Sequence, residues 1–171
     1  MKKILLAMIV GLTWMQAADN DLYDHAVGLY VGYGSTGGDA GAVYGLRIDQ
    51  NLHAPEGIFN LDAVQFALDY ARLNGAGWDY AVRLGGNALW FSETDENWMP
   101  FVKAGLGVQF FGGSGTVAVG NHFYGTLGGG VEYQLRPDTS VVAELVDHLS
   151  FSMENTLRAS VGLKYSFGQG Y

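Results

Sequence analysis

The sequence predicts an all-β fold, an eight-stranded antiparallel up-and-down transmembrane β-barrel. Three observations predict it. Eight segments of about ten residues alternate apolar and polar side chains. The charged residues in the middle of these segments all lie on the face opposite the large apolar residues. Aromatic residues gather near the segment ends, as they do where a membrane barrel meets the two interfaces.

The first four segments span residues 25–34, 42–49, 64–71 and 79–90. In the first of them, Val27, Leu29 and Val31 share one face, while Gly28 and Tyr30 share the other. The next three place large aliphatic and tyrosine side chains opposite Gly, Ala and charged residues. Because successive side chains of a strand point to opposite faces, each segment is predicted to be a strand with one apolar face.

The last four segments span residues 101–110, 123–135, 140–146 and 157–167, and they repeat the pattern. Turn-rich stretches separate the eight segments, at 35–41, 50–57, 72–77, 92–97, 111–121, 135–139 and 147–155. The segments suit a tilted membrane-spanning strand, which needs about 9–11 residues, whereas soluble strands more often run about 5–6. An even strand number also lets an antiparallel barrel close without an unpaired edge.

The polar face is predicted to form the lumen of the barrel. It carries Asp49 and a predicted lumen charge network made of Arg47, Asp69, Arg83, Lys103, Glu132, Glu144, Arg158 and Lys164. An eight-stranded interior is narrow and is filled by side chains, and buried charges must be paired. We therefore expect Glu144 to pair with Arg158. We also expect Lys103 to reach Glu132, and Arg83 to reach Asp69. The network is interpreted as a structural plug, with a small-ion path or gate as the alternative.

Six inward glycines accompany these charges: Gly28, Gly32, Gly105, Gly107, Gly128 and Gly130. Two explanations fit them. They make room for long Arg, Lys and Tyr side chains, or they permit strong curvature of the strands.

The aromatic residues predict two belts. One comprises Tyr33, Tyr44, Tyr70, Trp78, Tyr80, Phe110, Phe111, Phe123 and Tyr124. The other comprises Phe59, Trp90, Trp98, Phe101, Tyr133, Tyr165 and Phe167. Membrane interfaces favour such belts, because one side of each ring is apolar and the other is wet.

The N-terminus has the composition of a secretory signal peptide. Lys2 and Lys3 precede an apolar stretch over residues 4–12, which is too short to span a membrane as a helix. We predict a signal peptide over residues 1–18, cleaved near Ala18, and a barrel domain over residues 19–171. The alternative is a buried amphipathic N-terminal helix.

Composition excludes several classes of function. Loss of Lys2 and Lys3 with the signal peptide changes the formal charge from −8 to −10, and such an acidic chain is a poor partner for nucleic acid. The absence of cysteine excludes disulfides, thiolate metal sites and a cysteine nucleophile. His25, His53 and His122 stand apart in the sequence, so no metal site and no cofactor is predicted.

The C-terminal strand carries the most specific motif. Ser160, Gly162, Tyr165 and Phe167 follow the pattern polar, x, Gly, x, x, aromatic, x, aromatic. With this motif, residues 22–167 resemble the small outer-membrane β-barrels of OmpA/OmpX type. In that family the motif resembles the signal recognised by the barrel-assembly machinery. The family pattern usually ends at its last aromatic residue, whereas here Gly168–Tyr171 follow, and we expect them to form a short periplasmic tail.

The resemblance implies a location in the cell outer membrane, with both termini in the periplasm. It implies outer-membrane lipid, lipopolysaccharide and the assembly machinery as partners, and we expect a monomer. The predicted role is structural, in membrane integrity, without a wide pore and without enzymatic activity. Alternatives are a surface-binding module, a small-ion channel, a soluble secreted barrel and a barrel enzyme that modifies lipid A.

The enzyme alternative depends on one short stretch. His148 and Ser150 lie two residues apart and Glu154 follows, and barrel-type lipid A deacylases use these residue types near the outer leaflet. The flanking residues do not match that family. We therefore interpret the stretch as a polar loop tip.

Overall fold

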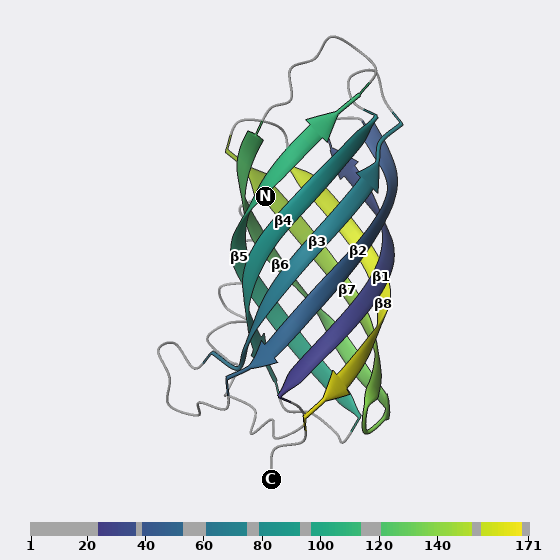
Figure 1. Cartoon of the computed structure of the whole chain (residues 1–171), viewed down its shortest axis with the longest axis vertical. Coiled ribbons are helices and arrows are strands. Elements are labelled where there is room, and N and C mark those ends of the chain that lie inside the picture. The colour runs from purple at the N-terminus through teal and green to yellow at the C-terminus, as the bar shows by residue number, and fades with distance from the viewer. Residues whose placement is uncertain are drawn as a thin grey trace.

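A computed structural model shows a closed barrel of eight antiparallel strands in which each strand pairs with its neighbours in sequence and β8 pairs with β1 (Figure 1). The strands are β1 (His25–Thr36), β2 (Asp39–Asn51), β3 (Ala63–Arg72), β4 (Tyr80–Phe91), β5 (Trp98–Gly112), β6 (Asn121–Arg136), β7 (Thr139–Ser150) and β8 (Thr156–Phe167). The predicted fold class and up-and-down topology are confirmed.

The structure describes residues 24–36, 39–52, 61–74, 79–92, 97–113, 121–151 and 155–168. The predicted signal peptide, residues 1–18, and most of the predicted tail lie outside these ranges, so both stay predictions. No helix long and apolar enough to cross a membrane occurs among the described residues.

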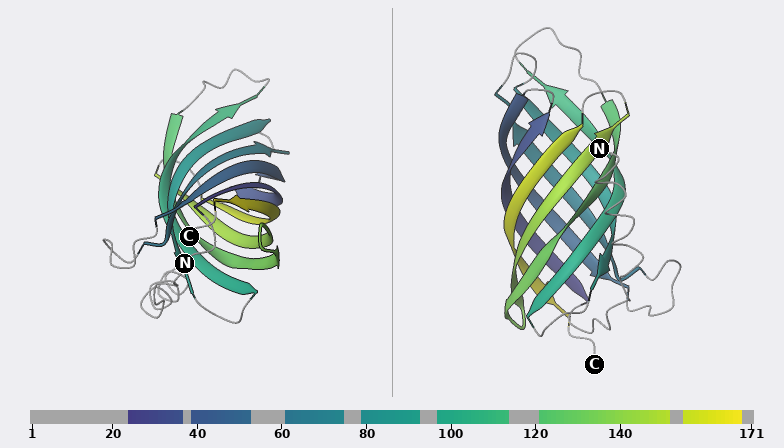
Figure 2. Two further views of the ribbon diagram at one scale, coloured as in Figure 1. Left: turned by 60° about the horizontal axis from the view of Figure 1, so that its bottom comes forward. Right: turned by 180° about the vertical axis from the view of Figure 1, so that it is seen from behind.

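The wall of the barrel is continuous, and the strands cross it obliquely (Figure 2). At one end His25 pairs with Phe167, and we call this the terminal end. The opposite end, where Thr36 pairs with Thr156, is called the loop end. Every backbone ladder is satisfied within the wall, which is what a sheet surrounded by hydrocarbon requires.

The strands extend further than the sequence pattern predicted. Residues 147–150 were predicted to lie in a turn, and this prediction is wrong. His148 still pairs with Thr126 on β6 and with Thr156 on β8, so the ladder continues. The polar residues Asp147, His148 and Ser150 suggested a turn in the sequence. His148 instead continues the alternation of β7, because it faces the lumen like Glu144 before it.

The outer face is apolar across the middle of the barrel. Large exposed side chains on it include Leu29, Val31, Ile48, Phe66, Leu68, Leu84, Leu106, Leu145, Val161 and Leu163. A protein that carried this surface into water would expose an apolar patch far larger than soluble monomers show. The outer face therefore fits a bilayer, with lipid chains taking the place of a protein core.

The two aromatic belts are only partly as predicted. Rings exposed near the loop end belong to Tyr33, Tyr44, Tyr70, Tyr80 and Phe123, and those near the terminal end belong to Trp98, Tyr165 and Phe167. Trp78 and Phe59 lie outside the described residues.

Three residues assigned to the belts point inward instead. Phe101, Phe111 and Tyr124 are at most 3% exposed. Each lies two residues from a lumen-facing residue of its own strand. Period-two alternation therefore turns its side chain inward, although aromatic rings generally prefer the membrane interface.

An arginine on the outer face tests the membrane assignment. Val161 lies near the middle of β8 between Val31 and Ala143. We expect Val161→Arg to lower the free energy of unfolding in phospholipid vesicles by about 2–4 kcal/mol, because the charge enters the bilayer midplane. Leu135→Arg, beside the β6–β7 turn, is the matched control and should cost about 0–1 kcal/mol. Equal small losses at both positions would indicate a face exposed to water.

Candidate functional site

The interior of the barrel is the candidate functional site. The eight residues of the predicted lumen charge network, together with Asp49, all have their side chains inside, and none is more than 6% exposed. They come from seven of the eight strands, and alternation places each of them on the same face of the wall. Buried charges of this number must be arranged as a connected system, since each isolated charge would cost several kcal/mol.

Glu144 on β7 is the hub of this system. One carboxylate oxygen accepts hydrogen bonds from Arg158 Nη2 at 2.6 Å and from Ser160 Oγ at 3.1 Å. The other accepts from Lys103 Nζ at 2.7 Å and lies 3.5 Å from Arg47 Nη1. One carboxylate thus meets three cations from three other strands.

Arg158 on β8 connects this hub to a second carboxylate. Its Nη1 donates to Asp69, while its Nη2 donates to Glu144. The guanidinium also lies over the ring of Tyr30, 4.8 Å from the centroid, and Nη1 is 3.1 Å from the Tyr30 hydroxyl. The Tyr30 hydroxyl in turn donates to Asp69. Charge, hydrogen bonding and cation–π contact therefore fix the guanidinium together.

A third group of charges lies toward the terminal end. Lys164 Nζ donates to Glu132 and lies 3.9 Å from Asp49 Oδ2. Gln65 joins this group to the hub, because its amide nitrogen donates to Asp49 at 2.9 Å and its amide oxygen accepts from Lys103 at 3.2 Å. The hub, Arg158 and this third group therefore form one connected polar network, whereas Arg83 hydrogen-bonds Gln109 and Thr156 instead.

Two of the three predicted pairings are wrong in detail. Lys103 pairs with Glu144, and Glu132 pairs with Lys164. Arg83 lies directly across the ladder from Asp69 but hydrogen-bonds Gln109 and Thr156, because Arg158 and Tyr30 occupy the carboxylate. The expected contact between Glu144 and Arg158 is present, although the register sets Ser160 opposite Glu144 and Val146 opposite Arg158, so the contact is diagonal.

Uncharged residues also line the lumen, and the sequence analysis did not assign them to the predicted charge network. Tyr30, Gln65, Gln109, His148 and Thr156 are all buried in the lumen. Strand phase could have identified four of them, since Gln65, Gln109, His148 and Thr156 alternate in step with a charged residue of their own strand, and Tyr30 shares its face of β1 with Gly28 and Gly32. Their hydrogen-bond partners follow from barrel closure, which brings together strands far apart in the chain.

Glycine makes space for the largest lumen groups at two positions. A Cβ atom at Gly28 would stand 2.6 Å from Arg47 Nε, and one at Gly45 would overlap the Tyr30 ring. The first of the two explanations therefore accounts for Gly28, and Gly45, which was not among the six predicted inward glycines, has the same role: both admit side chains that arrive from neighbouring strands.

Apolar clusters close the network at both ends. Toward the loop end, Val43, Ala71, Leu73, Ala81 and Phe111 pack together. Toward the terminal end, the cluster contains Ala63, Leu89, Phe91, Phe101 and Val142, with Met99 against it. The inward aromatic residues Phe101 and Phe111 belong to these two layers. A continuous file of water through the barrel would have to pass both.

The interpretation of His148 as part of a polar loop tip is wrong. His148 lies inside the barrel, where its ring meets Tyr124 edge-on at 4.9 Å and its Nε2 is 3.8 Å from Asp69. Ser150 lies 3.4 Å from the Gln109 amide, and Glu154 is outside the described residues. A His–Ser hydrogen bond of the kind that activates a serine nucleophile does not occur in the described part of the chain, because neither ring nitrogen of His148 has a hydrogen-bond partner there. No group of described residues is arranged to hold a metal.

The C-terminal motif divides between the two faces of β8. Ser160 and Gly162 lie on the lumen side, while Tyr165 and Phe167 are exposed on the outside with their rings 6.5 Å apart. Gly168 follows with a positive φ of 74°, a conformation that suits glycine. Its carbonyl accepts a 2.7 Å hydrogen bond from the Asp24 amide and so fastens the chain end to the start of β1.

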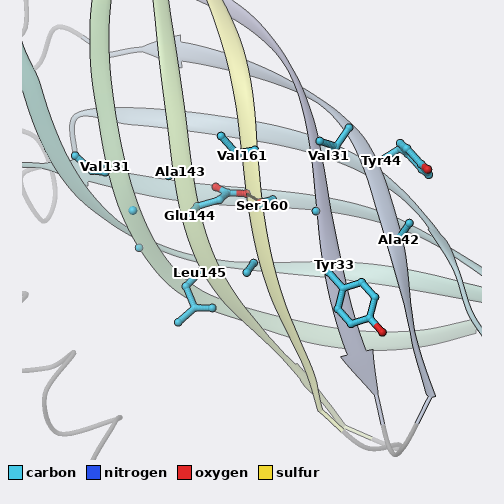
Figure 3. Close-up of a pocket in the computed structure, with 14 residues that line it drawn as sticks. Val31, Tyr33, Ala42, Tyr44, Val131, Ala143, Glu144, Leu145, Ser160 and Val161 are labelled. Atoms are coloured by element: carbon cyan, nitrogen blue, oxygen red, sulfur yellow. Dashed lines mark hydrogen bonds between the residues drawn. The ribbon is translucent and has the colours of Figure 1, made fainter.

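A shallow depression on the outer wall lies over β1, β2, β6, β7 and β8 (Figure 3). Its lining is mostly apolar, with Val31, Tyr33, Leu145 and Val161 around small residues. Glu144 and Ser160, which are hydrogen-bonded to each other, contribute to it from the lumen side. In a bilayer, acyl chains cover such a surface, and no polar group there converges on a ligand.

Comparisons with known proteins agree on the fold. No protein-family model matches the sequence, and no curated protein matches it. The structure is similar to the N-terminal β-barrel domain of Pseudomonas aeruginosa OprF, with a TM-score of 0.60 and 18% identity over 85% of this chain and 98% of that domain. It is similar to Neisserial surface protein A, with a TM-score of 0.57 and 15% identity over 84% and 96% of the two chains.

A third similar structure is the outer membrane enzyme PagL, with a TM-score of 0.53 and 16% identity over 83% of this chain and 99% of PagL. These neighbours differ in function, so the similarity identifies an architecture and not an activity. The apolar outer face and the filled interior agree with the same architecture. The chain therefore has the fold of the small eight-stranded barrels of bacterial outer membranes, as its sequence predicted.

Proposed function

We propose that this chain is a monomeric integral protein of the outer membrane, whose role is to stabilise the envelope as a closed barrel. One observation carries the proposal: a connected charge network fills the lumen between two apolar clusters. Outer-membrane lipid and lipopolysaccharide are its proposed surroundings. The fold alone does not choose this role, because neighbours of the same architecture include an enzyme.

The structural role has a direct test in cells. We expect cells that lack the chain to become more sensitive to detergents and to bulky antibiotics, and the wild-type chain to restore resistance. Unchanged sensitivity of the deletion strain would contradict an envelope-stabilising role.

Purified protein tests the closed lumen. Glu144→Gln removes the carboxylate shared by Lys103 and Arg158 and leaves buried cations uncompensated, so we expect about 3–5 kcal/mol less free energy of unfolding in vesicles. Asp138→Asn, in the exposed β6–β7 turn, is the control and should change stability by less than about 0.5 kcal/mol.

The double variant Glu144→Gln with Arg158→Gln separates a plug from a gate. We expect it to lose resistance to heat in gel-mobility assays while its conductance in planar bilayers stays at the wild-type level, because the apolar clusters remain. A clear rise in conductance would instead show that the ion pairs close an ion path.

We further propose that Ser160, Gly162, Tyr165 and Phe167 are recognised by the barrel-assembly machinery. Tyr165 and Phe167 support this, since their stacked rings are exposed at the end of the closing strand. We expect Phe167→Ala to reduce the assembled fraction several-fold, while truncation after Phe167 leaves it near the wild-type level.

The matched control for assembly is Leu157→Ala, which lies at the other end of the same strand and has a similar exposed fraction on the outer face. It should assemble normally, as judged by the fraction of heat-modifiable protein in membranes. If truncation abolished assembly and Phe167→Ala did not, the recognised end would be Tyr171.

A further inference from the structure

The buried charges of the lumen are unevenly distributed. Lys164 lies with two carboxylates, Asp49 and Glu132, toward the terminal end. The rest of the network holds four cations, Arg47, Arg83, Lys103 and Arg158, against the two carboxylates Asp69 and Glu144. This part therefore has a formal surplus of +2 in a region closed to solvent, where an uncompensated charge is expensive.

Arg83 accounts for half of that surplus. It is 1% exposed, and no carboxylate of the described residues lies within 4 Å of it. Its Nε is 3.3 Å from the Gln109 amide oxygen and its Nη2 is 3.2 Å from Thr156 Oγ1, both neutral partners. The remaining nitrogen, Nη1, is buried without a hydrogen-bond partner among the described residues.

Other unpartnered donors are brought to the same section of the lumen. Thr156, which Arg83 contacts, is the ladder partner of His148 on β7. Arg158 is the next inward residue of β8 after Thr156. Arg158 Nε and both ring nitrogens of His148 have no hydrogen-bond partner in the described structure. Arg83, Arg158 and His148 thus bring four unpartnered nitrogens to one level of the lumen near the loop end, where the Asp69 carboxylate contacts Arg158 and lies 3.8 Å from His148 Nε2.

We propose that this region binds a small monovalent inorganic anion of the chloride class. An anion between Arg83 Nη1, Arg158 Nε and a His148 ring N–H would accept from donors that are otherwise unsatisfied and would offset part of the surplus charge. Water would satisfy the donors but would leave the charge. The loop-end cluster of Val43, Ala71, Ala81 and Phe111 lies beyond Arg83 and Asp69 on their strands and would slow the exchange of a bound ion.

The test measures stability at constant ionic strength while chloride replaces isethionate, a much larger organic anion. The unfolding midpoint of the wild-type protein in micelles should rise with the logarithm of the chloride concentration once the site is half filled. Arg83→Gln should remove this dependence. Arg72→Gln, which deletes an exposed arginine of β3, is the matched control and should keep it.

Arg83→Lys keeps the charge and should retain part of the chloride dependence, which separates loss of the anion from a general packing defect. Crystals of the wild-type protein grown in bromide should also show anomalous density beside Arg83 Nη1, a measurement that needs no variant. The proposal would be overturned by equal unfolding midpoints in chloride and isethionate, or by the absence of an anomalous peak beside Arg83 Nη1. Either result would assign the region to water. Neither result bears on conductance, so the proposed closed lumen stands or fails separately.

Discussion

The bridge that Arg158 makes between Asp69 and Glu144 is the interaction on which the interior depends. It joins β8 to β3 and β7, and through Tyr30 it also reaches β1. A planar guanidinium suits this position because its fixed fork can serve two carboxylates and present its face to a ring at once. A lysine ammonium at this position would carry the same charge but would lack the planar fork and the flat face of the guanidinium. The arrangement therefore connects four strands across the lumen as well as neutralising charge.

Most of the architecture could be predicted because it depends on local properties of the chain. Alternation in segments such as 157–167 determines which residues face the lumen, and the even strand number determines closure. The same rule, applied strictly, would have turned Phe101, Phe111 and Tyr124 inward. It would also have carried β7 through His148. These errors came from giving residue type more weight than strand phase at the ends of strands.

The pairing inside the lumen could not be predicted, because it depends on geometry across the barrel. Arg83 and Asp69 are ladder partners. The hydrogen bonds to the Asp69 carboxylate nevertheless come from Tyr30 on β1 and Arg158 on β8, the first and last strands of the barrel. Which cation reaches a carboxylate depends on side-chain length, strand tilt and the space left by residues such as Gly28 and Gly45. None of these can be obtained from the alternation of residue types.

The seam between β1 and β8 has a consequence for how the chain reaches its native state. Arg158 is separated in sequence from Tyr30 by 128 positions and from Asp69 by 89, yet it contacts both. Contacts of such separation form late, because the loop-closure entropy must be overcome first. Until the seam closes, the carboxylates on β3 and β7 lack the cation from β8 and need hydration. The interior of the half-formed barrel must therefore be hydrated. Closure of the last strand is the step that expels this water.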